Sequence, residues 1–186
     1  MEEKDNVLSI YDLKKCKSKK NIVTKEMFIE LVKENKISLY RLAKSILKVE
    51  VDVEDAISET VLKAFKNIKK LKSLESFKPW IMRILVNECY SIINKKSKVE
   101  LEEDMEVYNL QYEEQEEKTL IWAVNKLDGE FRTVIILFYY EDMSIRDISG
   151  VLNIPEGTIK SRLSRAKGKL KLIIENENGS DIIGEI

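Results

Sequence analysis

Apolar residues recur at helical spacing near the C-terminal end of the chain. Ile159, Leu163, Ala166, Leu170 and Ile173 follow one another at intervals of four, three, four and three residues. This period places all five on one face of an α-helix, and that face requires burial. Six glycines and two prolines in 186 residues leave few turn residues for an all-β architecture, where breakers recur about every 8–12 residues. The sequence therefore predicts an all-α fold.

The charges are separated into blocks, although 32 basic and 33 acidic residues leave a formal net charge of −1. Residues 63–98 hold ten bases and two acids, and residues 158–171 hold six bases and no acid. Between these blocks, residues 100–118 hold nine acids and one base. An acidic run without helix-period apolar residues is typical of a solvated linker. We therefore expect two small helical domains joined by an acidic linker.

The helical patterns divide the chain into five parts. The first domain has helical periodicity over 25–47, interrupted near Asn35–Lys36, then a helix over 52–65 and another that opens at Pro79. The second domain has helical patterns over 120–127, 130–140 and 145–152, and a last helix from Pro155. The expected parts are a flexible basic arm (1–24), the first domain (25–98), the linker (99–118), the second domain (119–174) and a frayed tail (175–186).

Composition excludes several classes of function. No apolar run approaches the roughly 18 residues of a membrane span, and the acidic N-terminus lacks a secretory apolar region. The chain has no histidine for a zinc site of the Cys/His type, and Cys16 and Cys89 cannot form a disulfide framework. We therefore expect a protein of the reduced cytoplasm with no metal and no cofactor.

The pattern of the second domain is that of a helix-turn-helix. Ser144 is suited to cap the helix over 145–152, with Asp147 three residues further on. Asn153 tolerates the left-handed conformation that a short turn requires. The helix that follows is basic and carries serines at its exposed start, as expected of a helix that enters the major groove of DNA.

This part of the chain resembles a known family. The stretch Ile154–Ala166, IPEGTIKSRLSRA, with EDMSIRDISGVLN before it, resembles the promoter-reading domain four of extracytoplasmic-function sigma factors of bacterial RNA polymerase. In that family the helix reads the minus-thirty-five promoter element. The residues predicted to contact this element are Thr158, Lys160, Ser161, Ser164, Arg165 and Lys169.

Two segments of the first domain carry the same resemblance. DVEDAISETVLKAF, from Asp52, resembles the segment that grips the clamp of the largest polymerase subunit, with Ser58 where the family usually has Gln. FKPWIMRILVNECYSIINKKSK, from Phe77, resembles the helix that, with the loop over 69–76, reads the minus-ten element as single strands form. The predicted polymerase contacts are Asp52, Asp55, Ser58, Glu59 and Thr60, and the predicted minus-ten contacts are Lys69, Lys70, Lys72, Ser73, Ser76, Asn87, Ser91, Asn94 and Lys95.

The resemblance implies a non-enzymatic specificity subunit. Its partners would be core RNA polymerase, promoter DNA in duplex and single-stranded form, and an anti-sigma factor, with no insertion into a membrane. From its charge alone, we expect the acidic linker to mimic nucleic acid and to hinder DNA binding by the free protein. Two alternatives stay open: a self-sufficient helix-turn-helix regulator, and a helical enzyme built on the carboxylates between Asp52 and Glu59, used as acid and base.

Overall fold

The computed structural model describes residues 23–71, 73–99 and 120–183. Helices joined by short turns, and no strand, occur in these ranges, which confirms the all-α prediction. Lys72, nearly all of the predicted N-terminal arm and the acidic linker from residue 100 lie outside the described residues.

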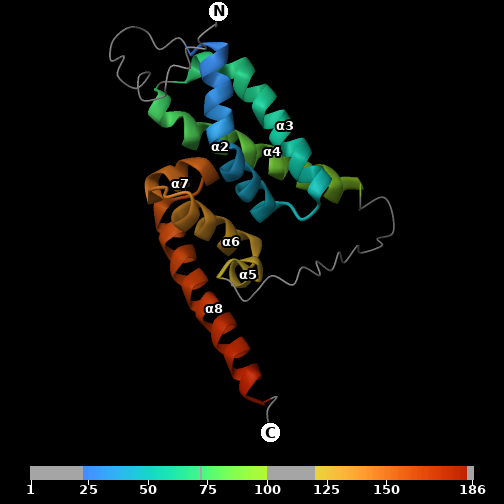
Figure 1. Ribbon diagram of the computed structural model, residues 1–186, viewed down its shortest axis with the longest axis vertical. Coiled ribbons are helices and arrows are strands. Elements are labelled where there is room, and N and C mark those ends of the chain that lie inside the picture. Colours follow the sequence, from blue (N-terminus) through green and yellow to red (C-terminus); the bar gives the residue numbers. More distant parts are fainter. Residues whose placement is uncertain (1–22, 72, 100–119, 184–186) are drawn as a thin grey trace, which may run out of the picture.

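Three long helices form an N-terminal unit in which each packs against the other two (Figure 1). Their apolar stripes meet in a core that includes the aromatic ring of Phe28, which lies 5.3 Å from that of Phe65 and 6.1 Å from that of Phe77 between ring centroids. Trp80 is half-buried against this core. The elements of this unit are α2 (Lys25–Ile46), α3 (Glu50–Asn67), the 3-10 turns η1 (Ile68–Lys70) and η2 (Leu74–Ser76), and α4 (Phe77–Val99).

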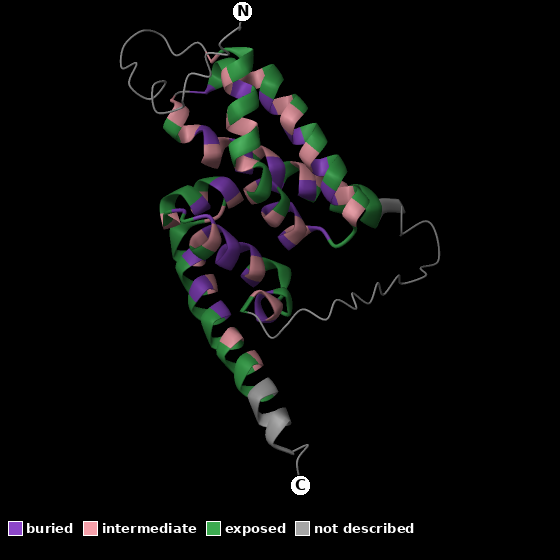
Figure 2. Cartoon of the chain, viewed as in Figure 1, coloured by how far each residue is buried: buried purple, intermediate pink, exposed green. Residues whose placement is uncertain are grey.

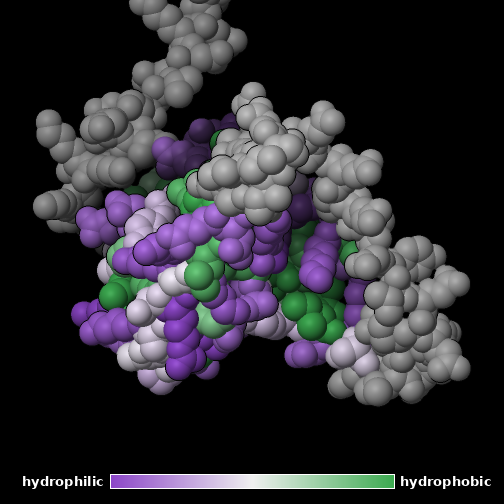
Figure 3. Space-filling view, turned by 90° about the horizontal axis from the view of Figure 1, so that it is seen from below, coloured by the Kyte–Doolittle hydropathy of each residue, from purple (hydrophilic) through white to green (hydrophobic). Residues whose placement is uncertain are grey.

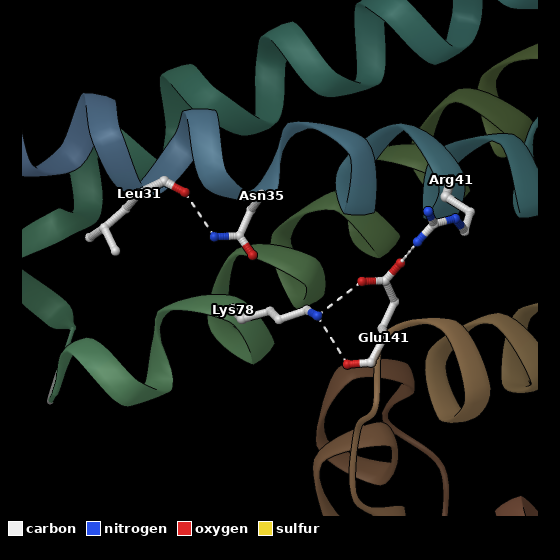
Figure 4. Close-up of polar contacts among 5 residues, drawn as sticks. All are labelled: Leu31, Asn35, Arg41, Lys78 and Glu141. Carbon is white, nitrogen blue, oxygen red and sulfur yellow. Dashed lines mark hydrogen bonds and ion pairs between the residues drawn. The ribbon is translucent and has the colours of Figure 1, made fainter. Parts of the chain in front are cut away.

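Helix α2 is continuous, so the predicted interruption near Asn35–Lys36 is wrong. Thr24 caps its start by accepting a hydrogen bond from the backbone N–H of Met27. Asn35 is a polar residue in the stripe between Leu31 and Leu39, which is why the periodicity looks broken there. Its side-chain amide donates to the carbonyl of Leu31 at 2.8 Å, and this bond inside the helix compensates for its partial burial (Figure 4).

The C-terminal unit contains shorter helices packed on one long helix. Val134, Ile148, Ile159 and Ala166 are fully buried between them. The elements of this unit are α5 (Leu120–Asn125), α6 (Gly129–Ile135), the π-helix η3 (Ile136–Tyr140), α7 (Ile145–Leu152) and α8 (Glu156–Ile183).

The start of α7 and the turn between α7 and α8 have the predicted chemistry. Ser144 accepts a hydrogen bond from the backbone N–H of Asp147 at 3.1 Å and donates its hydroxyl to the Asp147 carboxylate at 2.6 Å. Asn153 adopts the left-handed conformation, with φ of 55°. The carbonyl of Pro155 accepts the first backbone bonds of α8, from Thr158 and Ile159, so this proline lies one position before the helix.

Two elements differ from the predicted pattern. The helix predicted over 130–140 changes at Ile136 from an α-helix into the wider π-helix η3. Its end is marked by Asp142, a non-glycine residue with a positive φ of 50°. The tail predicted to fray at 175–186 is helical up to Ile183, because α8 continues beyond the body of the C-terminal unit.

The two units are docked on one another rather than held apart. Helix α2 lies against α6 and η3, and α4 lies against α7. Buried residues line the faces where helices meet, whereas exposed residues cover the outer faces and much of the lower half of α8 (Figure 2). Viewed from below, the described surface is mainly hydrophilic, with smaller groups of hydrophobic residues between the charged ones (Figure 3).

We expect the Ser144→Ala variant to lower the free energy of unfolding by about 1 kcal/mol, because it removes the hydrogen bond that caps α7. Urea denaturation followed by circular dichroism measures the change. Ser58→Ala is the matched control, because Ser58 is exposed within α3 and alanine there favours the helix. Equal losses of stability in both variants would contradict a capping role for Ser144.

Candidate functional sites

Helix α8 presents a polar face at its N-terminal half. Ile159, Leu163 and Ala166 are buried in the C-terminal unit, at 0%, 6% and 0% exposure. This burial directs the residues one or two positions further on toward solvent. The exposed residues of this face are Lys160, Ser161, Ser164 and Arg165. Four of the six predicted minus-thirty-five residues therefore share one accessible surface.

The other two predicted residues of α8 are held in part by their own unit. Thr158 is half-buried, and its carbonyl accepts the hydroxyl of Ser161 at 2.9 Å. The ammonium of Lys169 lies 2.5 Å from the Asp128 carboxylate and 4.8 Å from the ring centre of Phe131. Lys169 thus links α8 to the start of α6. It therefore stabilises the C-terminal unit, in addition to any contact that it makes with DNA.

Further bases of α8 also contact the C-terminal unit. Arg162 forms an ion pair with Glu130 at 2.7 Å, and the Lys167 ammonium lies 5.6 Å from the centre of the Tyr139 ring. The positive charge noted in the sequence is therefore divided between internal contacts and an outward face. Only the tertiary contacts separate these two groups of bases.

A second polar surface lies on the C-terminal half of α4. A hollow of about 380 Å³ is lined by Asn87, Tyr90, Ser91, Asn94 and Lys95. Four of these residues were predicted as minus-ten contacts, and the structure brings them together. Tyr90, whose side chain is 47% exposed, was missed. Its spacing from Asn87 and Asn94, three and four residues, is the signal that could have placed it on this face.

The loop residues of the predicted minus-ten site do not line this hollow. Lys69 and Lys70 are exposed in η1, at the end of α3. The hydroxyls of Ser73 and Ser76 lie 2.7 Å apart and are half-buried, so each is engaged by the other. Lys72 lies outside the described residues. The loop and the hollow are thus two separate surfaces of the N-terminal unit.

The predicted polymerase residues on α3 divide into three groups. Asp55, Ser58 and Glu59 are exposed, and Glu59 also lies 3.5 Å from the Lys63 ammonium. The Asp52 carboxylate is only 15% exposed and accepts a hydrogen bond from Lys96 at 2.7 Å, which ties α3 to the end of α4. Three of the five residues therefore form an accessible acidic and polar surface.

Thr60 is a correction to this predicted set. Its side chain is fully buried, and its hydroxyl has no hydrogen-bond partner in the described part of the chain. Thr60 continues the stripe of Val53, Ala56 and Ala64, at intervals of three and four residues, which faces the core. A direct contact of the Thr60 side chain with a partner is therefore excluded in this arrangement.

Several pKa values are shifted around these surfaces. The hydrogen bond from Lys169 lowers the pKa of Asp128, and the hydrogen bond to Glu88, at 2.5 Å, raises the pKa of Lys63. Burial raises the pKa of the Cys89 thiol to about 12, so this thiol stays protonated and unreactive near neutral pH.

The residues that the structure describes hold no group of His, Cys, Asp or Glu side chains arranged to bind a metal ion. Among these residues, no helix has the length and apolarity needed to span a membrane.

Comparison with known proteins agrees with the order of the two units. Residues 31–99 match the family model for Sigma-70 region 2, and residues 120–170 match that for Sigma-70, region 4. The RNA polymerase sigma factor SigV of Bacillus subtilis is 26% identical over 163 residues, which cover 86% of this chain and 98% of SigV. The ECF RNA polymerase sigma factor SigW of Bacillus subtilis is 27% identical over 164 residues, which cover 78% of this chain and 88% of SigW.

A solved structure has the same fold. The sigma factor RpoE from Bartonella quintana, in complex with the anti-sigma factor NepR, superposes with a TM-score of 0.66 at 26% identity, over 80% of this chain and 96% of RpoE.

Region 2 followed by region 4, each with its own polar surface, defines a two-domain sigma factor of the sigma-70 type. The chain belongs to the extracytoplasmic-function (ECF) sigma factors, which direct promoter-specific transcription initiation. A self-sufficient helix-turn-helix regulator is not favoured, because region 2 would then be unexplained.

We expect the Lys169→Gln variant to raise the pKa of Asp128 toward its ordinary value, because the charged hydrogen-bond donor is lost. The lowered pKa of Asp128 stabilises the fold above the pKa of the unfolded chain, and this contribution disappears as the pH falls through the folded-state pKa. Carboxyl ¹³C chemical shifts followed through a pH titration measure the change. Lys167→Gln is the control, because it removes a charge two residues earlier in α8 that lies near Tyr139 rather than near Asp128, and it should leave the Asp128 titration unchanged. An unchanged pKa in Lys169→Gln would refute the contact.

Proposed function

We propose that this chain binds core RNA polymerase as a non-enzymatic specificity subunit, reads the minus-thirty-five element with α8 and opens the minus-ten element with α4 and the preceding loop. The single observation that carries the proposal is the presence of two separate polar surfaces, one on each unit, in the order of sigma regions 2 and 4. Its site of action would be the bacterial cytoplasm, where the polymerase and the chromosome are.

Recognition of the minus-thirty-five element would use the exposed start of α8 in the major groove. The Arg165 guanidinium can donate two hydrogen bonds to the O6 and N7 edge of guanine. Lys160 and the hydroxyls of Ser161 and Ser164 can hold phosphates or base edges beside it. Arg162 is paired with Glu130, so its side chain would hold the recognition helix in place rather than contact DNA.

Opening of the minus-ten element would use the hollow on α4. Single-stranded DNA binds to surfaces that combine positive charge with amide and hydroxyl groups and with aromatic faces for stacking. Lys95 supplies the charge, Asn87 and Asn94 supply amides, and Tyr90 supplies the aromatic face. Lys69 and Lys70, on the separate surface at η1, would hold the backbone of the strand further along its path.

Binding to the polymerase would use the exposed side of α3. Asp55, Ser58 and Glu59 form the surface that would meet the clamp of the largest subunit. A rim of acidic groups mainly increases the association rate and fixes the orientation of the partners. RpoE from Bartonella quintana is held by the anti-sigma factor NepR, and we propose that an anti-sigma factor holds this chain as well.

We expect Arg165→Ala to change promoter choice. Loss of a bidentate base contact costs about 1–3 kcal/mol at one base pair and relaxes the preference there. The matched control is Lys171→Ala, since Lys171 is an exposed base of α8 beyond the polar face. It should weaken binding to all promoters and reduce the salt slope by about one. Reconstituted transcription from a promoter library distinguishes the two variants. If both variants weaken initiation equally at all promoters, α8 binds DNA through its charge and does not read the base sequence.

We expect the double variant Asp55→Lys/Glu59→Lys to bind core polymerase more slowly, by about fivefold or more at low salt, because the acidic surface is reversed. Surface plasmon resonance measures the association rate. The control reverses two exposed acids of α2, Glu30→Lys/Glu34→Lys, and so changes the net charge equally. Equal slowing in the control would show that net charge rather than this surface is responsible.

A further inference from the structure

Covered carboxylates lie at two helix junctions of the molecule. Glu141 is 1% exposed and lies between Arg41 of α2 and Lys78 of α4, where the two units meet (Figure 4). Glu88 on α4 and Asp52 on α3 are 14% and 15% exposed, and they lie where α3 packs against α4 inside the N-terminal unit. Acids are seldom covered unless a cation accompanies them. Because α4 also carries the hollow, the partners of Glu88 and Asp52 matter for the proposed minus-ten site.

Ion pairs tie α3 to α4 at both ends of this hollow. The ammonium of Lys63 on α3 lies 2.5 Å from the Glu88 carboxylate, and that of Lys96 on α4 lies 2.7 Å from the Asp52 carboxylate. The residues that line the hollow lie between positions 87 and 95 of α4. Glu88 directly follows the first of these positions, and Lys96 directly follows the last. On α4 the two pairs have opposite charges, since one contains an acid of this helix and the other a base.

Lys63 is shared unequally between two acids. Its ammonium lies 2.5 Å from Glu88 and 3.5 Å from Glu59, an exposed residue of the proposed polymerase surface. The hydrogen bond to Glu88 is the largest cause of the raised pKa of Lys63. The Lys63 side chain is 44% exposed and remains hydrated, whereas the Glu88 side chain is 14% exposed and depends on its partner. Glu88 is therefore the principal partner of Lys63.

Glu88 lies next to the face of α4 that forms the hollow. It follows Asn87 by one residue and precedes Ser91 by three, and both of these residues line the hollow. At about 100° per residue, the Glu88 side chain leaves the helix beside that face. A carboxylate there repels the phosphates of a strand bound nearby, over a distance of about 10 Å at moderate salt. The ion pair with Lys63 compensates for this negative charge, so the positive charge of Lys95 prevails at the hollow.

We propose that Lys63 is a positioning residue of the minus-ten site, which holds the Glu88 carboxylate toward α3 and away from the DNA strand in the hollow. The inference rests on the proposed function of the hollow, and it adds a residue of another helix that acts through Glu88 without touching the strand. Without Lys63, the Glu88 carboxylate is covered and uncompensated, and it recovers hydration by turning toward the open side of α4.

A double-mutant cycle tests this role in the holoenzyme, assembled with saturating core polymerase. The probe is a forked duplex with a single-stranded minus-ten segment, taken from a promoter at which the wild-type holoenzyme initiates. Lys63→Met should weaken probe binding by about fivefold or more at low salt, and by less at high salt, because salt screens the repulsion. Binding by Lys63→Met/Glu88→Gln should return to within about twofold of the wild type. A double variant as weak as Lys63→Met would show that Lys63 itself contacts DNA.

Two control variants separate charge compensation from other effects. Lys66→Met removes the same charge from an exposed position of α3, and so measures the loss due to net charge. Asp52→Asn removes the other ion pair between α3 and α4 but frees a base, Lys96, so it should not weaken probe binding. If Lys63→Met binds as well as Lys66→Met, or if Asp52→Asn binds as weakly as Lys63→Met, the proposal is wrong.

Glu88→Gln provides a test that does not depend on the stability of Lys63→Met. The amide keeps the shape of the side chain and removes its charge, so probe binding should equal or exceed that of the wild type. Weaker binding by Glu88→Gln would show that the carboxylate contributes to strand binding, which contradicts the proposed role of Lys63. Far-UV circular dichroism establishes that the helices of each variant remain formed.

The outcomes separate the role of Lys63 from the proposed function. A wild-type holoenzyme that initiates at no promoter refutes the function of the chain. A wild-type holoenzyme that initiates and binds the forked probe, together with a double variant that does not recover, refutes the role of Lys63 alone.

Discussion

The apolar stripe of α8 is the constraint on which the recognition surface depends. Ile159, Leu163 and Ala166 must be buried to close the core of the C-terminal unit. Because the helix is rigid, this burial also decides which residues face solvent, and Lys160, Ser161, Ser164 and Arg165 follow from it. Packing energy and DNA recognition are therefore linked in one element, with Arg162 and Lys169 holding it through Glu130 and Asp128.

The same separation of faces organises the N-terminal unit. The stripe of α3 that contains Val53, Ala56 and Thr60 packs inward, and Asp55 and Glu59 consequently face outward. On α4, the burial of Leu85 and Cys89 leaves Asn87 and Tyr90 on the exposed side, where the hollow forms. Between the two units, Glu141 is the exception to this rule. It is a charged group placed inside, and it is tolerated because two cations from the other unit compensate for its lost hydration.

Local patterns predicted much of this structure, and their failures have physical causes. The cap at Ser144 and the left-handed turn at Asn153 depend on neighbouring residues alone, so the sequence predicts both. Asn35 was misread as a break because its compensating bond, to the carbonyl of Leu31, forms only inside the helix. The resemblance to the family assigned Thr60 to the polymerase surface. Its position in the apolar stripe of α3, between Ala56 and Ala64, places it in the core instead. Tyr90 was missed because only the spacing from Asn87, and no motif, marks it.

The sequence by itself determined the all-α class, the positions of the main helices, the two basic blocks and the family of the chain, since all of these depend on composition, periodicity and short motifs. The tertiary structure alone decided which bases of α8 are engaged by acids of their own unit and how the units dock. Arg41 and Glu141 are 100 residues apart in the chain and approach to 2.5 Å. No local propensity encodes such a contact, because it depends on the packing of α2 against α6 and η3 and on the π-turn that directs Glu141 toward both cations.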